Sequence, residues 1–247
     1  SGGGRLHAGD GAGGLHALDP VRTVWSPVAL PFLGVGDRIV TASAAGPRLY
    51  LGTRHGRVFG GDGSGAWSDL GALASGGPVL AIAALDPSVD RLLAGSPGGG
   101  VEQRDPAAGW IDDGATLVGR SIGSFAALAD GTWIAGASDG LYRRDGPGLW
   151  SVVGLAGIAV ADLDSDGVRV LAGTLGGGLF SGAPSSGWTR LPGSPADGAN
   201  VRAALRDGAG SVEWGLAADG GLALEATLFD EAGGEVARLG PAALPFV

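Results

Sequence analysis

Residues 133–150 read WIAGASDGLYRRDGPGLW, and this stretch decides the fold because its pattern recurs along the chain. It consists of a short apolar run ending in Gly136, a turn of small and polar residues, a second run at Leu141 and Tyr142, and an Asp followed by Trp150. The turn residues are of the kind that supplies the positive φ angles of a tight hairpin. The stretch therefore predicts a pair of antiparallel strands.

Five copies of this hairpin superpose closely, and a sixth copy is weaker. The five copies lie at Arg5–His16, Leu49–Phe59, Leu92–Glu102, Trp133–Tyr142 and Val170–Phe180. The sixth is expected to run from Val212–Gly215 through the turn Ala218–Gly221 to a second run at Leu222–Ala223. Self-similarity of this kind is typical of architectures built from equivalent units.

Each hairpin is flanked by two further candidate strands. Downstream, Trp recurs at a nearly constant offset, at Trp25, Trp67, Trp110, Trp150 and Trp188. Upstream of five hairpins lies an Ala-rich run, at Ile39–Ser43, Leu80–Ala84, Ser124–Ala127, Ile158–Ala161 and Val201–Ala204. A unit thus contains four short antiparallel strands, and six units of roughly 41 residues, within the range of propeller blades, account for the chain.

We therefore predict an all-β fold, a six-bladed β-propeller of four-stranded antiparallel blades. Residues 1–4 are interpreted as a tag remnant or flexible end, and residues 5–247 as a single domain. The blades are expected at residues 5–30, 31–77, 78–119, 120–157, 158–199 and 200–247. Strands such as Arg91–Ala94 are apolar at successive positions, which indicates that neighbouring blades bury both faces of each sheet.

Closure of the ring is expected to involve both chain ends, because an open ring would leave an unpaired strand edge. The first blade lacks an Ala-rich strand, and the chain ends in Pro241–Val247 with no hairpin after it. We expect this tail to pair with the first blade. The tail also echoes Pro27–Phe32, which reads as a connector between blades, so closure by another route stays open.

The repeat resembles the BNR or Asp-box repeat of sialidase, sortilin and photosystem-assembly-factor propellers. Three segments carry the resemblance, each with Trp five residues after Asp: Asp62–Trp67, Asp105–Trp110 and Asp145–Trp150. In that family the box is a structural hairpin remote from any active site. The resemblance therefore implies a fold and no particular chemistry.

Composition excludes several classes of protein. The 247 residues carry a net charge of −9, all 16 basic residues are Arg without a cluster, and Cys is absent, which argues against nucleic-acid binding and excludes disulfides. Every apolar run is interrupted before the roughly 18 residues that a membrane span needs. With 45% hydrophobic residues the chain must bury a core. We expect a monomer without a membrane span, and slightly favour an extracytoplasmic or secreted location.

The candidate binding site is the turn Thr53–Arg57, the only locally basic turn on this acidic chain. Its residues Arg54, His55 and Arg57 would contact an acidic protein partner or a carboxylated glycan. The alternative is that these residues form an ordinary solvated turn. We expect no catalytic residues, and interpret the protein as a non-catalytic binding or assembly scaffold that presents propeller loops to a protein partner.

Two metal sites were considered. Asp162, Asp164 and Asp166 have the D-x-D-x-D-G spacing that wraps oxygen ligands around Ca²⁺, although the acidic residues that complete such loops are missing, and a solvated turn is the alternative. If residues 10–13 form a four-residue loop, His7 and His16 face each other across two strands. Positions equivalent to His7 are apolar or aromatic, and those equivalent to His16 include Phe59, Tyr142 and Phe180, so we favour packing over zinc binding there.

The alternative functions are a glycan-binding lectin and a sialidase-like glycoside hydrolase. The resemblance implies that a sialidase needs an arginine cluster and a Tyr/Glu nucleophile pair. Arg38, Arg120 and Arg202 lie at or near the Ala-rich strands. The only two tyrosines, Tyr50 and Tyr142, occupy packing positions, and no Glu lies where it could activate either. A lectin predicts a repeated polar and aromatic pocket in each blade.

Overall fold

The structure is a computed structural model, and the part of the chain that it describes consists mostly of strands. The described residues are 7–9, 13–19, 24–31, 33–34, 36–63, 66–191, 201–206, 212–216, 226–229 and 235–239. The chain divides into two compact units, Ser1–Ile122 and Gly123–Val247. Each unit is described by itself.

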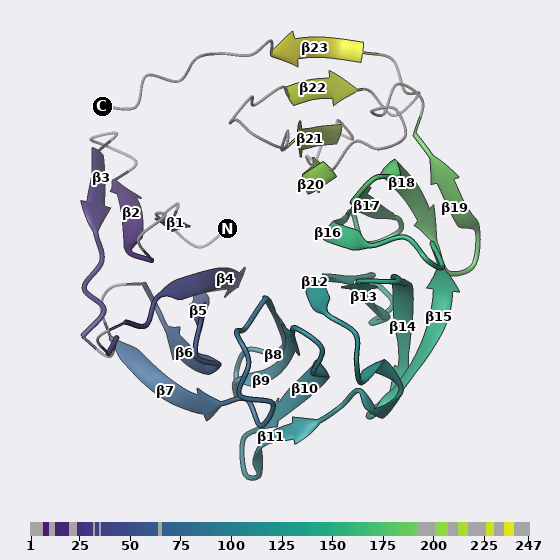
Figure 1. Ribbon diagram of the computed structural model, residues 1–247. Helices are drawn as coiled ribbons and strands as arrows, with labels where there is room; N and C mark the ends of the chain where they lie inside the picture. Colours follow the sequence, from purple (N-terminus) through teal and green to yellow (C-terminus); the bar gives the residue numbers. More distant parts are fainter. Residues whose placement is uncertain are drawn as a thin grey trace. The chain divides into compact units, whose positions relative to one another are not determined.

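The described residues of the first unit form three antiparallel sheets, in which each strand lies beside its neighbour in the sequence (Figure 1). The first sheet contains β1 (His7–Gly9), β2 (Leu15–Asp19) and β3 (Val24–Pro27). The second contains β4 (Ile39–Ala45), β5 (Arg48–Thr53), β6 (Arg57–Gly61) and β7 (Trp67–Ala72). The third contains β8 (Ala81–Asp86), β9 (Arg91–Ser96), β10 (Gly100–Asp105) and β11 (Gly109–Asp112).

The second unit contains three four-stranded antiparallel sheets with the same strand order. The fourth sheet contains β12 (Ile122–Ala127), β13 (Trp133–Ala137), β14 (Gly140–Gly146) and β15 (Leu149–Gly154). The fifth contains β16 (Val160–Ser165), β17 (Val170–Thr174), β18 (Gly178–Ala183) and β19 (Gly187–Arg190). The sixth contains β20 (Val201–Arg206), β21 (Val212–Leu216), β22 (Ala226–Phe229) and β23 (Glu235–Leu239).

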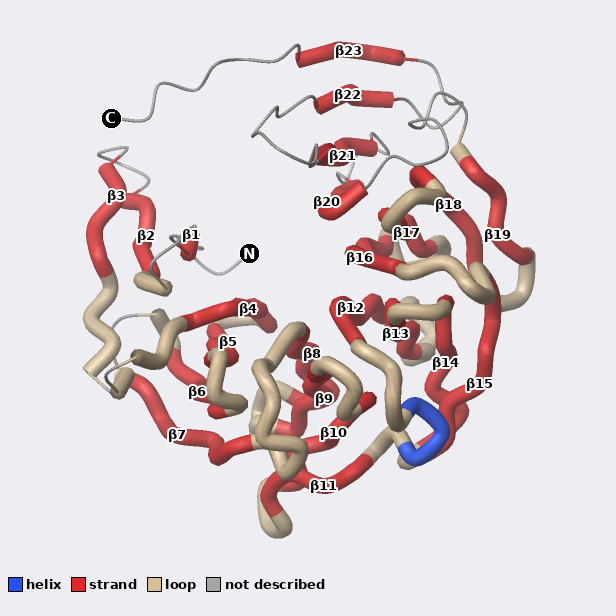
Figure 2. The backbone as a smooth tube through the Cα atoms, viewed as in Figure 1, coloured by secondary structure: helices blue, strands red, loops and turns tan. Residues whose placement is uncertain are grey.

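The predicted four-strand unit is confirmed in the second to sixth sheets. Its Ala-rich strand, apolar strand, third strand and fourth strand lie side by side in chain order, and the Trp series lies in the last strand of each of the first five sheets. The helical content of the described residues is a single 3₁₀ turn, η1 (Ala115–Leu117), drawn in blue in Figure 2. Within the same residues, no helix has the length and apolar character needed to cross a membrane.

In the second to fifth sheets the second strand is buried on both faces, as its continuous apolar character predicts. Leu51 in β5, Leu92 and Leu93 in β9 and Leu171 in β17 are fully buried. Each such side chain contributes about 1.5–3 kcal/mol to folding through the apolar surface that it removes from water. These strands therefore form the core of both units.

The Gly that ends the apolar run is required by the close approach of the next sheet. A Cβ atom added to Gly52 would lie 2.6 Å from the side chain of Val79, a residue just before the third sheet begins. It would lie 2.7 Å from the side chain of Thr41 in its own sheet. The equivalent Gly136 would place a Cβ 2.9 Å from Val160 at the start of the fifth sheet. Real Cβ atoms do not approach so closely, so the repeated Gly is a packing requirement between sheets.

The repeated Trp hydrogen-bonds to the sheet that precedes it. The Nε1 atom of Trp110 in β11 donates to the carbonyl oxygen of Leu70 in β7, at 3.0 Å. In the second unit, Nε1 of Trp188 in β19 donates to the carbonyl oxygen of Val153 in β15, at 2.8 Å. In both pairs, therefore, the indole links the fourth strands of neighbouring sheets.

Two predictions of strand pairing are wrong. His7 lies opposite Ala17, and His16 lies opposite Ala8, because the β1–β2 loop is one residue longer than predicted. A shift of one residue turns a side chain to the other face of a sheet, so the two histidines do not face each other. In the sixth sheet, β21 pairs with β22 (Ala226–Phe229), and Gly215 lies opposite Ala226, so the loop of this hairpin is longer than predicted. The predicted run Leu222–Ala223 itself lies outside the described residues. The predicted pairing of the tail 241–247 lies outside the described residues.

Candidate functional site

One face of the hairpin β6–β7 carries four side chains of contrasting chemistry. In the pairing of these strands, Phe59 lies opposite Asp69 and Gly61 lies opposite Trp67. Because alternate residues of a strand share a face, Arg57 lies on the same face as Phe59, and Trp67 on the same face as Asp69. A cation, a carboxylate and two aromatic rings thus share one face of the second sheet. Arg57 and Asp69 are exposed and Trp67 is half-buried, whereas Phe59 is buried, with 3% of its surface exposed.

Asp37, which precedes β4, organises the turn between β5 and β6. Its Oδ1 atom accepts hydrogen bonds from the backbone N–H of Arg38 at 2.9 Å and of His55 at 3.3 Å. The same oxygen lies 3.1 Å from His55 Nδ1. Asp37 therefore fixes the position of His55.

These residues line an open pocket of about 430 Å³ on the second sheet, referred to below as the pocket. Its lining consists of Gly34, Asp37, His55, Arg57, Phe59, Trp67 and Asp69. Arg57 pairs with Asp69 through Nη2, and its guanidinium carbon lies 6.0 Å from the centre of the Phe59 ring. The volume lies within the usual range for sites that bind small ligands or single side chains.

The pocket contains two of the three predicted binding residues. His55 and Arg57 line it, whereas Arg54 lies exposed in the same turn and is not part of the lining. Contrary to the description of the turn as a basic patch, His55 and Arg57 are each paired with a carboxylate. The turn itself is held by Thr53, whose Oγ1 atom accepts a hydrogen bond from the backbone N–H of Arg57 at 3.1 Å.

Sequence reasoning missed the other four side chains of the pocket: Asp37, Phe59, Trp67 and Asp69. The sequence does contain a signal for Phe59, Trp67 and Asp69. The alternations Arg57/Phe59 and Trp67/Asp69 place each pair on one face once the hairpin register is known. For Asp37 no signal was available, because it reaches the site from a connecting segment.

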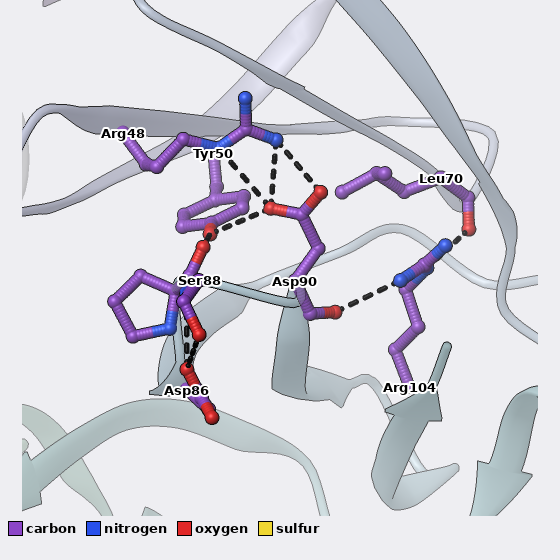
Figure 3. A network of polar contacts seen from close by, with 8 residues as sticks. Arg48, Tyr50, Leu70, Asp86, Ser88, Asp90 and Arg104 are labelled. Carbon is purple, nitrogen blue, oxygen red and sulfur yellow. Dashed lines mark hydrogen bonds and ion pairs between the residues drawn. The ribbon is translucent and has the colours of Figure 1, made fainter. Parts of the chain in front are cut away.

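On the other side of the second sheet, a polar network joins it to the third sheet (Figure 3). Arg48 of β5 binds the carboxylate of Asp90 through Nη2, which lies 2.7 Å from both carboxylate oxygens. The hydroxyl group of Tyr50 donates to Asp90 Oδ1 at 2.9 Å. Burial raises the pKa of the Tyr50 phenol, and the hydrogen bond to Asp90 raises it further. The same carboxylate holds the pKa of Arg48 above its ordinary value.

The turn that carries Asp90 joins β8 to β9. Asp90 has φ of 51°, a left-handed conformation that is uncommon for residues other than Gly. Its carbonyl oxygen accepts a hydrogen bond from Nη1 of Arg104 at 2.9 Å, and Nε of Arg104 donates to the carbonyl oxygen of Leu70 at 3.2 Å. Asp90 thus joins two arginines and a tyrosine (Figure 3).

The acidic segment proposed for calcium lies partly in a strand. Asp162 and Asp164 belong to β16, and Asp166 lies in the following turn, where its Oδ1 atom accepts hydrogen bonds from the backbone N–H of Val168 at 2.8 Å and Arg169 at 2.7 Å. Within the residues that the structure describes, no group of three or more His, Asp or Glu side chains could hold a metal ion. Calcium binding stays a prediction, tested by adding Ca²⁺ to chelated protein and following its melting temperature.

The residues named for sialidase chemistry are placed within their own units as follows. Tyr50 and Tyr142 are buried, as predicted for packing positions. Nη1 of Arg120 donates to the carbonyl oxygen of Thr116 at 3.0 Å. Arg38 is exposed beside the Thr53–Arg57 turn, where its carbonyl oxygen accepts from the Arg54 N–H at 3.0 Å. The side chain of Arg202 lies outside the described residues.

Comparison with solved structures identifies the fold. YCF48 from Cyanidioschyzon merolae matches with a TM-score of 0.66 and 16% identity, over 97% of this chain and 80% of that chain. The computationally designed Ika8 protein matches with a TM-score of 0.62 and 14% identity, over 95% of this chain and 83% of that one. The chain has a β-propeller fold.

A third similar structure is the extracellular domain of the putative hybrid two-component system BT4673 from B. thetaiotaomicron. It has a TM-score of 0.62 and 16% identity, and the match covers 85% of this chain but 28% of that chain. No protein-family model and no curated protein matches the sequence. At these identities the likeness to solved structures shows the fold alone, and the BNR or Asp-box resemblance stays a prediction.

Proposed function

We propose that the protein is a non-catalytic binding scaffold that holds a protein partner at the pocket of the second sheet and the adjoining turn Thr53–Arg57. The observation that carries the proposal is the convergence of His55, Arg57 and two aromatic side chains on one open pocket of about 430 Å³. Pockets that combine an apolar surface with a few oriented polar groups are typical binding sites. The scaffold we propose is a six-bladed propeller, closed by pairing of the terminal segments.

Rigidity of the pocket supports a role in recognition. Its aromatic and charged residues Arg57, Phe59, Trp67 and Asp69 stand on the paired strands β6 and β7, and His55 is fixed by two contacts to Asp37. The strands fix the backbone positions of these residues, and the two aromatic rings have few rotamers to lose on binding, which favours affinity. A partner that touches these groups would meet a surface already arranged for it.

A lectin with one site per blade is less well supported. Trp110 and Trp188, the repeated aromatic residues in the third and fifth sheets, donate hydrogen bonds to the preceding sheet. Trp67 differs in that it lines the pocket. The aromatic series therefore favours a single binding site on the second sheet over a repeated set of sugar sites.

The proposal is tested by affinity capture from an extract of the source cells, followed by measurement of the captured partner's affinity. The double variant Arg54→Ala/Arg57→Ala is compared with Arg143→Ala/Arg169→Ala, which removes the same charge elsewhere. The control is matched because Arg143 is also paired with a nearby carboxylate, that of Asp145, and its side chain is 43% exposed, against 50% for Arg57. We expect loss of binding in the first variant alone.

Equal binding by the wild type and both double variants would overturn the proposed site. A glycan array run with the same proteins separates the alternatives. Retention of a sugar by the wild type, with no protein captured, would replace the scaffold proposal by the lectin. Turnover of a glycoside would replace it by the hydrolase.

A further inference from the structure

We propose that the pocket recognises a carboxylate next to an apolar side chain, as presented by an extended acidic peptide. This inference rests on the proposed function and names the chemistry of the partner. It follows from four properties of the pocket: the donors that it offers, the exposed ion pair of Arg57, the local positive charge, and the aromatic residues beside that charge.

The polar groups of the pocket offer hydrogen-bond donors to a ligand. Oδ1 of Asp37 already accepts from Arg38 and His55. The two carboxylate oxygens of Asp69 accept from the backbone N–H of Gly71, at 2.9 Å, and from Nη2 of Arg57. A guanidinium has five N–H donors in a planar fork that fits a carboxylate, and Asp69 accepts from one nitrogen of that fork. A ligand that accepts hydrogen bonds is therefore favoured.

The ion pair of Arg57 can be exchanged at little cost. The side chains of Arg57 and Asp69 are 50% and 44% exposed, so solvent screens their attraction. If Arg57 turned to a ligand carboxylate, Asp69 would keep its hydrogen bond from Gly71 and its contact with water. A surface pair of this kind differs from a buried pair, in which removal of one partner leaves a desolvated charge.

The charge around the pocket favours an anion, although the whole chain is acidic. The three arginines Arg38, Arg54 and Arg57 are exposed at or beside this turn, against the two carboxylates Asp37 and Asp69. The net charge of −9 repels a large polyanion at long range, whereas a short acidic segment meets mainly the local arginines. The attraction should therefore weaken with added salt.

The aromatic surface explains why a carboxylate alone is not the complete ligand. Phe59 and Trp67 line the same pocket, and the Arg57 guanidinium lies beside the Phe59 ring. In an extended peptide, residues two apart project from one face about 7 Å from each other. Arg57 and Phe59 are themselves two residues apart on β6, so an acidic and an apolar residue at the same spacing in a ligand would match them.

The test uses the whole protein and capped hexapeptides, with binding followed by ligand-observed saturation-transfer NMR. The probe contains Glu and Leu two residues apart in a Ser/Gly background. One matched peptide has Gln for Glu, and another has Ser for Leu. We expect the probe to bind with a Kd below about 1 mM, and each matched peptide to bind at least tenfold more weakly.

Protein variants locate the binding. We expect Arg57→Ala to weaken binding of the probe at least tenfold, Arg57→Lys to restore it in part because Lys keeps the charge without the fork, and the control Arg143→Ala to leave it unchanged. Circular dichroism and urea unfolding show whether each variant is folded. Raising the salt concentration should weaken binding of the Glu probe but not of the Gln peptide.

Three results would overturn this inference: equal binding of the Glu and Gln peptides, binding that Arg57→Ala does not change, or absence of peptide binding while sialyllactose binds at the pocket. Its failure is distinguishable from failure of the proposed function. If partner capture depends on Arg54 and Arg57 but the peptides do not bind, the scaffold role stands and the acidic-peptide assignment falls. If neither assay depends on these arginines, both fall.

Discussion

Each side of the second sheet carries an Arg–Asp ion pair, and the two pairs have different roles. On the side of the third sheet, Arg48 binds Asp90 in a network that also contains Tyr50. On the side of the pocket, Arg57 binds Asp69 of its own sheet. The side chains of the first pair are 30% and 22% exposed, and those of the second pair 50% and 44%.

The difference teaches that connectivity decides what an Arg–Asp pair contributes. Asp90 joins residues of two sheets. Its loss would leave the buried Tyr50 and the partly exposed Arg48 without the acceptor that they share. Asp69 joins two neighbouring strands that the backbone already pairs. The first pair is therefore expected to stabilise the fold, whereas the second remains free to exchange partners.

The largest effect is expected from filling the space between the second and third sheets. Gly52→Ala should lower the free energy of unfolding by about 3 kcal/mol, because the new Cβ would overlap Val79 and Thr41. Urea unfolding measures this change. The matched control is Gly34→Ala on the pocket side, where nothing lies within 4 Å of the new atom. Similar stabilities for the two variants would show that this junction is not closely packed.

The second largest loss of stability is expected when the carboxylate of Asp90, at the centre of the network, is removed. Asp90→Ala should cost about 2 kcal/mol of unfolding free energy, since the Tyr50 hydroxyl and the Arg48 guanidinium lose their acceptor. Asp86→Ala, in the same turn, provides the control. Asp86 accepts hydrogen bonds from Ser88 alone, which lower its pKa at an exposed position, and its loss should cost less. Equal costs would mean that the network does not couple the sheets.

The third prediction concerns alkaline pH. The pKa of Tyr50 is raised in the folded protein, so the phenol loses its proton at lower pH in the unfolded chain than in the folded one. The protonated Tyr50 therefore contributes fully to stability below about pH 10, and this contribution is lost as pH rises through the folded pKa. In Tyr142→Phe, Tyr50 is the only tyrosine left, and its ionisation can be followed by ultraviolet absorbance. We expect a midpoint above 10. Asp90→Asn in the same background should lower the midpoint, and an unchanged midpoint would contradict the assigned contact.

The smallest effect is expected on the pocket side. Arg57→Ala should change the free energy of unfolding by no more than about 0.5 kcal/mol, because its partner Asp69 is exposed and keeps a second hydrogen bond. Thermal and urea unfolding measure the change. A loss comparable with that of Asp90→Ala would show that Arg57 is a structural residue, and would remove the contrast between the two sides.

Much of the fold could be predicted because the repeat presents one pattern several times. The Ala-rich strand, the Gly-terminated strand and the Trp strand each recur, so an error in one copy is corrected by the others. The errors fall where only one copy is informative. The β1–β2 register depends on the length of one loop, and the third strand of the sixth sheet begins at Ala226, after a weak copy of the hairpin.

The binding site could be predicted only in part. The run Arg54–Arg57 is visible as a local excess of positive charge, but the carboxylates that neutralise it are remote in sequence. Asp37 precedes Arg54 by a whole strand hairpin, and Asp69 lies on the next strand. Local charge counting therefore finds the cations of a site but not their partners, which depend on hairpin register and on the path of a connecting segment.

The links between neighbouring sheets also have a direction along the chain. Trp110 reaches back to Leu70, and Trp188 reaches back to Val153, so in each case the carbonyl oxygen belongs to the sheet that comes earlier in the sequence. During translation the ribosome synthesises each acceptor before its indole donor. Each of these two indole hydrogen bonds can therefore form as soon as the later sheet emerges. The sheets that they join can associate in the order of synthesis, before more distant parts of the chain are made.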